Sequence, residues 1–261
     1  MGIINVSPDS FYQASPNFSD ALNKAIAMVA EGAAIIDVGA VATNPKINID
    51  SSMPSVQQEL DAVIPFVEAL AKKSDVMISV DTSRAIVMIA AVKAGAHMIN
   101  DQRALNEEGA LETAVKLNVS VCLMHHFNPV RQVGSSTHEA LIRQIKSDLQ
   151  NDISRCLLAG MKKENIIIDP GFGGGHFGKN ADENFYLLAH LKTLVDLSFP
   201  VLVGFSRKSM FAEIQSKVED RLHASIAAAT IAAMQGASIV RVHDVKATVD
   251  AMQVVERIFQ G

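Results

Sequence analysis

Short apolar runs alternate along this chain with longer segments in which apolar residues recur every three to four positions. A short apolar run bounded by turn-forming residues is typical of a buried strand, and the longer period is typical of an amphipathic helix. The strand-like runs occupy residues 2–6, 34–38, 76–80, 97–100, 119–124, 165–169, 201–204 and 238–242. Helical periodicity is clearest over residues 20–33, 55–73, 83–96 and 138–160, and several of these segments end in glycine, the usual helix terminator.

Strand and helix alternate eight times over the 261 residues, which predicts a (β/α)8 TIM barrel of parallel strands with its active site at their carboxyl ends. A doubly wound open sheet is the alternative. It would more naturally contain about five to seven strands, and the first turn here, NVSPDSF, lacks the glycine fingerprint of dinucleotide-binding sheets. No linker-like stretch divides the chain, so we expect residues 1–261 to form one domain.

The composition limits the classes of partner. A net charge of -5 argues against nucleic acid or an anionic membrane surface, so any bound anion must meet locally concentrated positive charge. The longest apolar run, residues 225–234, is shorter than the roughly 18 residues of a membrane span. The two cysteines, Cys122 and Cys156, form no disulfide framework or metal-spaced pair, and no cleavable signal opens the chain, which predicts a cytoplasmic location.

Polar side chains stand at the carboxyl end of every predicted strand, where barrels of this class carry their active sites. They are Asn5, Asp37, Asp81, Asn100, His125, Asp169, the run 206–208, and Arg241 with His243. Each has a structural alternative: Asp81 could cap a helix that begins near Ser83, and Asp37 could satisfy turn amides. Together they favour a ligand site, because inward-facing carboxylates and amides are costly to bury without partners.

Residue type divides this predicted site into two halves. Carboxylates and a carboxamide suit a heterocycle with amino and lactam edges, and they are Asp81, Asn100 and Asp169. Lys208, Arg241 and His243 supply cationic donors, which predicts an anion site beside strands seven and eight. Alternation within the last strand places Arg241 and His243 on one face, so we expect both to face a phosphorylated group.

Two apparent motifs have weaker support. The segment GGGHFGKN, residues 173–180, matches the spacing of a P-loop, but Asn180 replaces the hydroxyl that binds magnesium, so we expect a flexible active-site loop instead. His125 and His126 are adjacent and therefore point to opposite faces, and no third ligand is evident nearby, which disfavours zinc. We expect one of the two histidines to line the pocket and the other to face solvent.

Seven segments carry a family resemblance. They read MGIINVSPDSF (1–11), EGAAIIDVGA (31–40), ISVDTSR (78–84), AGAHMIND (94–101), IIIDPGFG (166–173), VLVGFSRKS (201–209) and IVRVHDV (239–245). In this order they resemble the dihydropteroate synthase family, a group of (β/α)8 barrels, over essentially the whole chain. The resemblance implies a transferase of the kind that sulfonamides target, which joins 6-hydroxymethyl-7,8-dihydropterin pyrophosphate to para-aminobenzoate, giving 7,8-dihydropteroate and pyrophosphate with Mg²⁺.

The resemblance also implies roles for individual residues. Pterin contacts would come from Asp81, Asn100, Met124, Asp169 and Lys208. Arg241 and His243 would bind the pyrophosphate, Arg241 would also stack on the pterin, and Asn5 would coordinate Mg²⁺. Para-aminobenzoate would contact Ser209 and an aromatic ring of the strand-six loop, either Phe172 or Phe177. The implied catalytic set is Asp81, Lys208, Arg241 and His243, and no side-chain nucleophile is required.

Two loops depart from the family pattern. The first reads YQAS at residues 12–15, and the second reads ATNP at residues 42–45, which retains Thr43 as a substrate contact but has Asn44 where the family has an arginine. In the family these loops close over pyrophosphate and para-aminobenzoate. We therefore expect the two departures to affect the second substrate and the catalytic rate more than the pterin pocket. The chain also starts at strand one, without the family's N-terminal hairpin, which suggests a fusion with the preceding folate-pathway enzyme; we expect a homodimer.

Two other functions remain open. A paralogue that binds pterin pyrophosphate without efficient condensation would account for the altered loops. A methyltetrahydrofolate-binding domain of a corrinoid methyltransferase shares the pterin-binding barrel. That class has no need of the cationic residues Lys208, Arg241 and His243, because its methyl donor carries no pyrophosphate.

Overall fold

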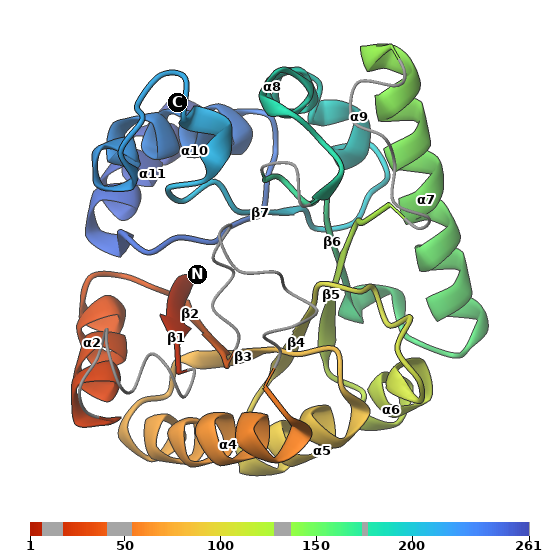
Figure 1. The fold of residues 1–261 in the computed structure, drawn as a ribbon, viewed down its shortest axis with the longest axis vertical. Helices are drawn as coiled ribbons and strands as arrows, with labels where there is room; N and C mark the ends of the chain where they lie inside the picture. The colour runs from red at the N-terminus through yellow and green to blue at the C-terminus, as the bar shows by residue number, and fades with distance from the viewer. Residues whose placement is uncertain (7–17, 41–53, 128–136, 174–176, 261) are drawn as a thin grey trace.

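Eight parallel strands alternate with helices along the chain (Figure 1). The computed structural model describes residues 1–6, 18–40, 54–127, 137–173 and 177–260. The strands are β1 (Gly2–Asn5), β2 (Ile35–Gly39), β3 (Met77–Asp81), β4 (Met98–Asp101), β5 (Ser120–Met124), β6 (Ile166–Asp169), β7 (Leu202–Val203) and β8 (Ile239–Val240). Each coincides with one of the eight predicted runs, although β7 and β8 are shorter than predicted.

The strands form a closed ring. β1 to β6 pair in sequence order as one parallel sheet, and β7 pairs in parallel with β8. Isolated parallel bridges join these two sheets, Ile168 with Val201 at one junction and Gly2 with Val242 at the other. At the second junction the Ile3 amide donates to the carbonyl of Val242 at 2.9 Å. The predicted (β/α)8 barrel is therefore confirmed.

Helices surround the ring on its outer side (Figure 1). They are α2 (Phe18–Ala30), α4 (Val56–Lys73), α5 (Ala85–Ala94), α6 (Ala110–Leu117), α7 (His138–Leu158), α8 (Ala181–Ala189), α9 (Lys192–Val195), α10 (Leu222–Met234) and α11 (Val245–Phe259), with 3-10 turns η1 (Lys163–Asn165), η3 (Ser209–Phe211) and η4 (Val218–Arg221). Side chains of Ser55, Thr137 and Asn180 cap the first turns of α4, α7 and α8. None of the helices within the described ranges is long and apolar enough to cross a membrane.

Alternation along the strands separates two environments. Outward side chains such as Val38, Val80 and Leu123 pack beneath the helices in the main core. Inward side chains near the amino ends of the strands form a second apolar cluster: Met98, Cys122, Ile167 and Leu202, with Met1 and Ile239 against them. Two residues further along the same strands stand Asn100, Met124, Asp169, Gly204 and Arg241. The inside of the barrel is thus apolar at its floor and polar at its mouth, the carboxyl end of the strands.

Candidate active site

Arg241 joins two carboxylates inside the barrel mouth. It follows β8, and its guanidinium donates from Nε to Asp37 Oδ2 at 2.6 Å and from Nη2 to Asp81 Oδ2 at 3.0 Å. We call Arg241, Asp37 and Asp81 the inner cluster. Asp37 lies within β2 and is completely buried, and Asp81 ends β3. A buried carboxylate is tolerated only when it is paired and hydrogen-bonded, so Arg241 is held in place by the charge it neutralises.

Neutral donors add hydrogen bonds to both carboxylates. Ser79 Oγ donates to Asp37 Oδ1 at 2.6 Å, and Asn100 Nδ2 donates to Asp37 Oδ2 at 3.1 Å. Gln102 Nε2 lies 3.0 Å and 2.8 Å from the two oxygens of Asp81. These donors come from inward positions of β3, of β4 and of the turn that follows β4, so the network links three neighbouring segments across the mouth.

Asp81 titrates in an unusual range. Burial raises the pKa of Asp81 to about 7, and the nearby carboxylates of Asp37 and Asp101 add to the rise, whereas Arg241 and the hydrogen bond from Gln102 oppose it. The cause is desolvation, which disfavours the charged form of a carboxyl group. Asp81 therefore changes its charge close to neutral pH.

Asp169 and Lys208 form an opposite-charge pair on the other side of the mouth. Burial raises the pKa of Asp169, and Lys208 opposes the rise; the Gly171 amide donates to Asp169 Oδ1 at 2.7 Å. Burial also lowers the pKa of Lys208 to about 8, and Asp169 opposes that change. Each charge thus offsets part of the other's desolvation penalty. A ligand that hydrogen-bonds to both would donate to the Asp169 carboxylate and accept from the Lys208 ammonium group.

Lys208 also lies beside the two phenylalanines expected as alternatives for the second substrate. Its Nζ donates to the carbonyl of Phe172 and lies 5.4 Å from the centre of the Phe177 ring. The Phe172 side chain is completely buried and packs on Phe205, with ring centres 4.5 Å apart. A Cβ atom at Gly173 would lie 2.3 Å from the Phe177 ring, so glycine is needed for this approach. Phe177 is the better placed of the two to contact a ligand.

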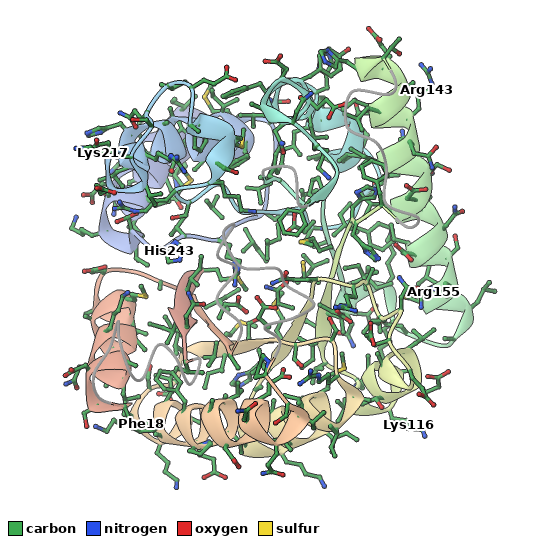
Figure 2. The ribbon with its side chains drawn as sticks, in the orientation of Figure 1. Phe18, Lys116, Arg143, Arg155, Lys217 and His243 are labelled. Atoms are coloured by element: carbon green, nitrogen blue, oxygen red, sulfur yellow. The ribbon has the colours of Figure 1, made fainter. Side chains whose placement is uncertain are left out.

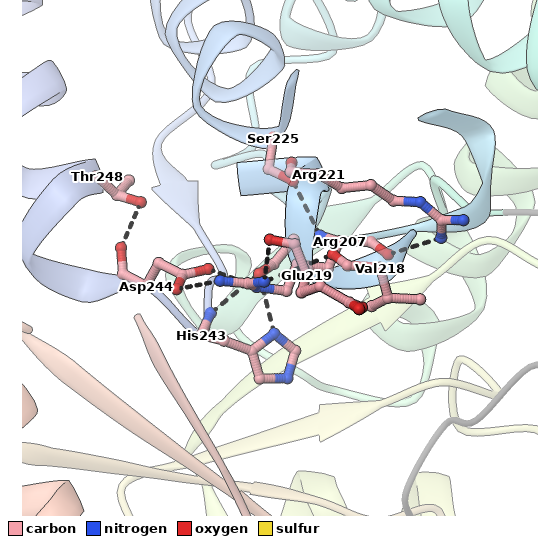
Figure 3. A network of polar contacts seen from close by, with 9 residues as sticks. Arg207, Val218, Glu219, Arg221, Ser225, His243, Asp244 and Thr248 are labelled. Atoms are coloured by element: carbon pink, nitrogen blue, oxygen red, sulfur yellow. Dashed lines mark hydrogen bonds and ion pairs between the residues drawn. The ribbon is translucent and has the colours of Figure 1, made fainter. Parts of the chain in front are cut away.

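His243 lies on the loop after β8 (Figure 3). Its Nδ1 is 2.9 Å from Ser206 Oγ, and its backbone N–H donates to the same oxygen at 3.2 Å. The next residue, Asp244, accepts two hydrogen bonds from the Arg207 guanidinium, at 3.0 Å and 2.8 Å. Burial lowers the pKa of His243 to about 4, and Arg241 lowers it further, so the imidazole is neutral at pH 7. His243 is therefore a neutral hydrogen-bonding group in this structure and not the cation suggested by the sequence.

The charge balance of the mouth differs from that of the helical surface. Basic side chains on the outer helices, such as Lys116 and Arg143, extend away from the barrel (Figure 2). In the described part of the mouth the cations Arg241 and Lys208 face three carboxyl groups, Asp37, Asp81 and Asp169. A phosphorylated ligand would add negative charge here, so its binding requires further positive charge.

The structure decides three questions that the sequence left open: the placement of His125, a capping role for Asp81, and the P-loop match. His125 was expected among the residues of the mouth, and this was wrong: it is 1% exposed and its Nε2 lies 3.1 Å from Asp148 on α7, outside the barrel wall. Asp81 does not cap the following helix, because α5 has no side-chain cap. The P-loop match fails as well, since Asn180 caps α8 and Lys179 is completely buried with Nζ 3.1 Å from the carbonyl of Phe177.

Other predicted site residues are placed but their roles are untested. Asn5 ends β1, Met124 ends β5 directly beside Asp169 in register, and half-buried Ser209 begins η3. Thr43 and Asn44 lie outside the described residues. Within the described ranges no group of three or more His, Cys, Asp or Glu side chains is arranged to hold a metal ion.

Sequence reasoning missed the partners that support this site. Asp37 was noted at a strand end but not assigned a role, and Ser79 and Gln102 were not noted at all. The signal available for all three was strand alternation: Asp37 and Ser79 each lie two residues before the end of their strand, and Gln102 lies two residues after Asn100.

The fold and this mouth together define a class, a (β/α)8 barrel enzyme whose mouth presents carboxylates, a carboxamide and a lysine. The model of the pterin binding enzyme family matches residues 1–243. The chain is 46% identical over 260 residues to the dihydropteroate synthase of Escherichia coli (strain K12), covering 98% of this chain and 90% of the relative. The chain belongs to the dihydropteroate synthase family.

Solved structures agree with this assignment. A dihydropteroate synthase from Coxiella burnetii in complex with pteroic acid is 49% identical and superposes with a TM-score of 0.92, covering 99% of this chain and 92% of that one. A dihydropteroate synthase from Xanthomonas albilineans with 4-aminobenzoic acid is 39% identical with a TM-score of 0.89, covering 99% and 92%.

Proposed function

We propose that this protein condenses 6-hydroxymethyl-7,8-dihydropterin pyrophosphate with para-aminobenzoate to give 7,8-dihydropteroate and pyrophosphate. The observation that carries the proposal is the convergence of Asp81, Asn100, Asp169 and Lys208 on one barrel mouth, in a chain of the dihydropteroate synthase family. The pteroic acid and 4-aminobenzoic acid complexes of its relatives support the same pair of substrate halves.

The pterin is recognised by hydrogen bonding at the strand ends. Carboxylates of Asp81 and Asp169 accept from the amino and ring N–H groups, and the Asn100 carboxamide offers a further acceptor. Lys208 donates to the ring carbonyl and a ring nitrogen. Met124 packs against the ring beside Asp169, which follows from their paired positions on β5 and β6.

Arg241 and His243 would hold the pyrophosphate, together with Mg²⁺ that Asn5 would coordinate. Arg241 is already paired with two carboxylates, and His243 is neutral. The further positive charge that a pyrophosphate needs therefore has to come from a cation that binds together with the pyrophosphate. The residues fit Mg²⁺, because this ion keeps most of its waters and takes one or two protein oxygens plus phosphate oxygens, and Asn5 offers a carboxamide oxygen at the end of β1. When bound, Mg²⁺ supplies positive charge to the leaving pyrophosphate.

Para-aminobenzoate lies next to the pterin methylene, in contact with Ser209 and Phe177. Phe177 offers an aromatic face beside Lys208, and Ser209 offers a hydroxyl at the start of η3. Thr43 contributes from the second loop.

The reaction is a substitution at the exocyclic methylene of the pterin. The bond from the methylene carbon to the pyrophosphate oxygen breaks first and its electron pair leaves with pyrophosphate. The amine nitrogen of para-aminobenzoate then forms the new carbon–nitrogen bond and loses a proton to water. Arg241 and His243 stabilise charge on the departing group, while the Asp81 and Asp169 carboxylates stabilise the cationic pterin methylene.

The protein acts as a cytoplasmic homodimer. Both cysteines are buried and unpaired, as suits a reducing compartment. Helices α10 and α11 pack together, and their carboxyl-terminal halves carry exposed apolar side chains: Ile231, Met234, Val254, Ile258 and Phe259. Ile258→Glu should convert a dimer to monomer in light scattering, and a wild type that is already monomeric would refute this part.

The assay is direct. The protein is incubated with both substrates and Mg²⁺, and 7,8-dihydropteroate and pyrophosphate are measured. Equal amounts of the two products support the proposal. Pterin binding without product would identify the non-condensing paralogue, and binding of methyltetrahydrofolate in preference to the pterin pyrophosphate would identify the methyltransferase domain.

A further inference from the structure

Gln102 lies in the mouth without a role in the functions described so far. It follows β4 as the first residue of a turn, and it is half-buried. Asn100 points into the barrel and Asp101 points out, so Gln102 continues the strand alternation and points in. Its Nε2 lies within hydrogen-bond distance of both oxygens of Asp81, at 3.0 Å and 2.8 Å.

The hydrogen bonds to Asp81 leave one acceptor position open. An ionised carboxylate has about four acceptor positions, two on each oxygen. Oδ2 receives Gln102 and Arg241, and Oδ1 receives Gln102. Within the described network, one acceptor position of Oδ1 therefore remains for a ligand N–H group.

The turn that carries Gln102 is fixed from several sides. Ala104 and Leu105 both have positive φ angles, 50° and 59°, a costly conformation for residues other than glycine. Asp101 accepts from the backbone N–H groups of Arg103 and Leu105 at 2.8 Å and 2.9 Å. Arg155 of α7 donates to the carbonyls of Ala104 and Leu105 at 2.5 Å and 3.1 Å. Strain persists only where the surroundings enforce it, and it is concentrated at functional sites.

We infer that Gln102 is a positioning residue of the pterin site, which holds the Asp81 carboxylate in the orientation and the ionised form that accept a pterin N–H group. The amide nitrogen can only donate, so it favours the charged carboxylate over the protonated acid. The inference rests on the proposed function, because Asp81 is the group through which Gln102 acts.

Other charged or titratable groups also act on Asp81, so the test has to isolate Gln102. They come from the strands and strand ends around the mouth and are Arg241, Asp37, Asp101, Lys208 and Cys122. All of them stay unchanged when residue 102 is replaced. A change in the titration of the site on replacing Gln102 alone is therefore attributable to the amide.

The experiment measures the dissociation constant of 6-hydroxymethylpterin by calorimetry from pH 5.5 to pH 9 in the full-length protein. Gln102→Met retains the length of the side chain and removes the donor, and Gln102→Glu replaces the donor with a carboxylate. Glu107→Gln is the matched control, because it breaks an exposed ion pair with Arg103 next to the same turn. The titration of the ligand itself is common to all variants.

We expect the acid limb of the binding profile to move upward by roughly one pH unit in Gln102→Met and further in Gln102→Glu, with affinity at pH 7 weakened roughly ten-fold. The alkaline limb, set by Lys208, and the Glu107→Gln profile should match wild type. A purely structural role would lower the melting temperature and weaken binding at every pH without moving the acid limb, and that result overturns the inference.

Two further outcomes separate a failure of this inference from a failure of the proposed function. If wild type binds the pterin and Asp81→Asn does not, but both Gln102 variants bind like wild type, the inference is wrong and the proposed function stands. If wild type itself fails to bind the pterin, the proposed function is wrong and the inference falls with it.

Discussion

Two arginine–carboxylate clusters lie on opposite sides of β3. Asp81 and Thr82 are adjacent in the chain, but each belongs to a different cluster. Asp81 points inward to Arg241 in the inner cluster. Thr82 points outward and donates to Glu59 Oε1 at 2.6 Å, and Arg84 donates to Glu59 Oε2 at 2.8 Å. We call Glu59, Thr82 and Arg84 the outer cluster.

The two clusters have similar chemistry but different surroundings. Each contains an arginine and a deeply buried carboxylate, since Asp37 is 0% and Glu59 is 2% exposed. The outer cluster ties α4 to the segment between β3 and α5, on the outer side of the barrel wall. The inner cluster lies among the candidate pterin residues. Residue type alone therefore does not distinguish a structural ion pair from a site; the face of the strand does.

The largest effect is expected from Arg241→Met. It leaves Asp37 buried without its charged partner, which should lower the free energy of unfolding by about 3–5 kcal/mol. It should also weaken pyrophosphate binding far more than binding of an uncharged pterin, because the lost contact is charge-assisted. Urea denaturation and calorimetry with both ligands measure the two effects. Equal losses for the two ligands would show that Arg241 is a structural or stacking residue only.

Arg84→Met makes the matching change in the outer cluster. Arg84 is partly exposed and Glu59 keeps its hydrogen bond from Thr82, so a smaller loss of stability is expected, about 2 kcal/mol. The pterin dissociation constant should stay at its wild-type value. A clear loss of pterin affinity here would break the distinction between the clusters.

Asp169→Asn tests the mouth away from the inner cluster. Loss of a charged acceptor to the ring should weaken pterin binding by about 1–3 kcal/mol, measured by calorimetry. Asp148→Asn is the control, because Asp148 bonds to His125 outside the barrel wall and should leave binding unchanged. Wild-type affinity in Asp169→Asn would exclude Asp169 from the pterin site.

The last prediction concerns the dependence of stability on pH. Burial raises the pKa of Asp81 to about 7, from an ordinary value of 3.8, so between these pH values the folded state holds a proton that the unfolded state has lost. The contribution of Asp81 to stability is therefore lost as pH rises through this window.

Asp81→Asn removes that titration. The free energy of unfolding of this variant, relative to wild type, should rise between about pH 4 and pH 7. Urea denaturation at intermediate pH values measures the trend, with Glu107→Gln as a control that should show none. A constant difference across the window would mean that Asp81 is ionised throughout it.

Most of the fold could be predicted from the sequence because it depends on local patterns. Short apolar runs and the period of 3.6 residues predicted the alternation of strands and helices, and α2, α4, α5 and α7 begin and end within a few residues of the predicted segments. The strand-end rule of barrels likewise indicated Asp81, Asn100, Asp169, Lys208 and Arg241.

The supporting residues could not be predicted in the same way. Asp37 lies inside a strand and was not assigned a role, because the sequence does not show that an arginine will come within reach of it. His125 was misplaced because the exact end of β5 sets the direction of every later side chain, and strand ends are the least certain part of a sequence-based prediction.

By itself the sequence determined the order of the elements, the apolar floor and the kinds of groups at the mouth, since each follows from the residues within one strand or helix. Only the tertiary structure decided which of these groups meet. Ring closure places the end of β8 beside β1, and so Arg241 reaches Asp37, 204 residues earlier in the chain. That closure also determines the buried environment, which lowers the pKa of His243 so that its imidazole is neutral at pH 7. The same burial moves the pKa values of Asp81 and Lys208 toward neutral pH. Desolvation depends on every element packed around a group, and no local pattern contains it.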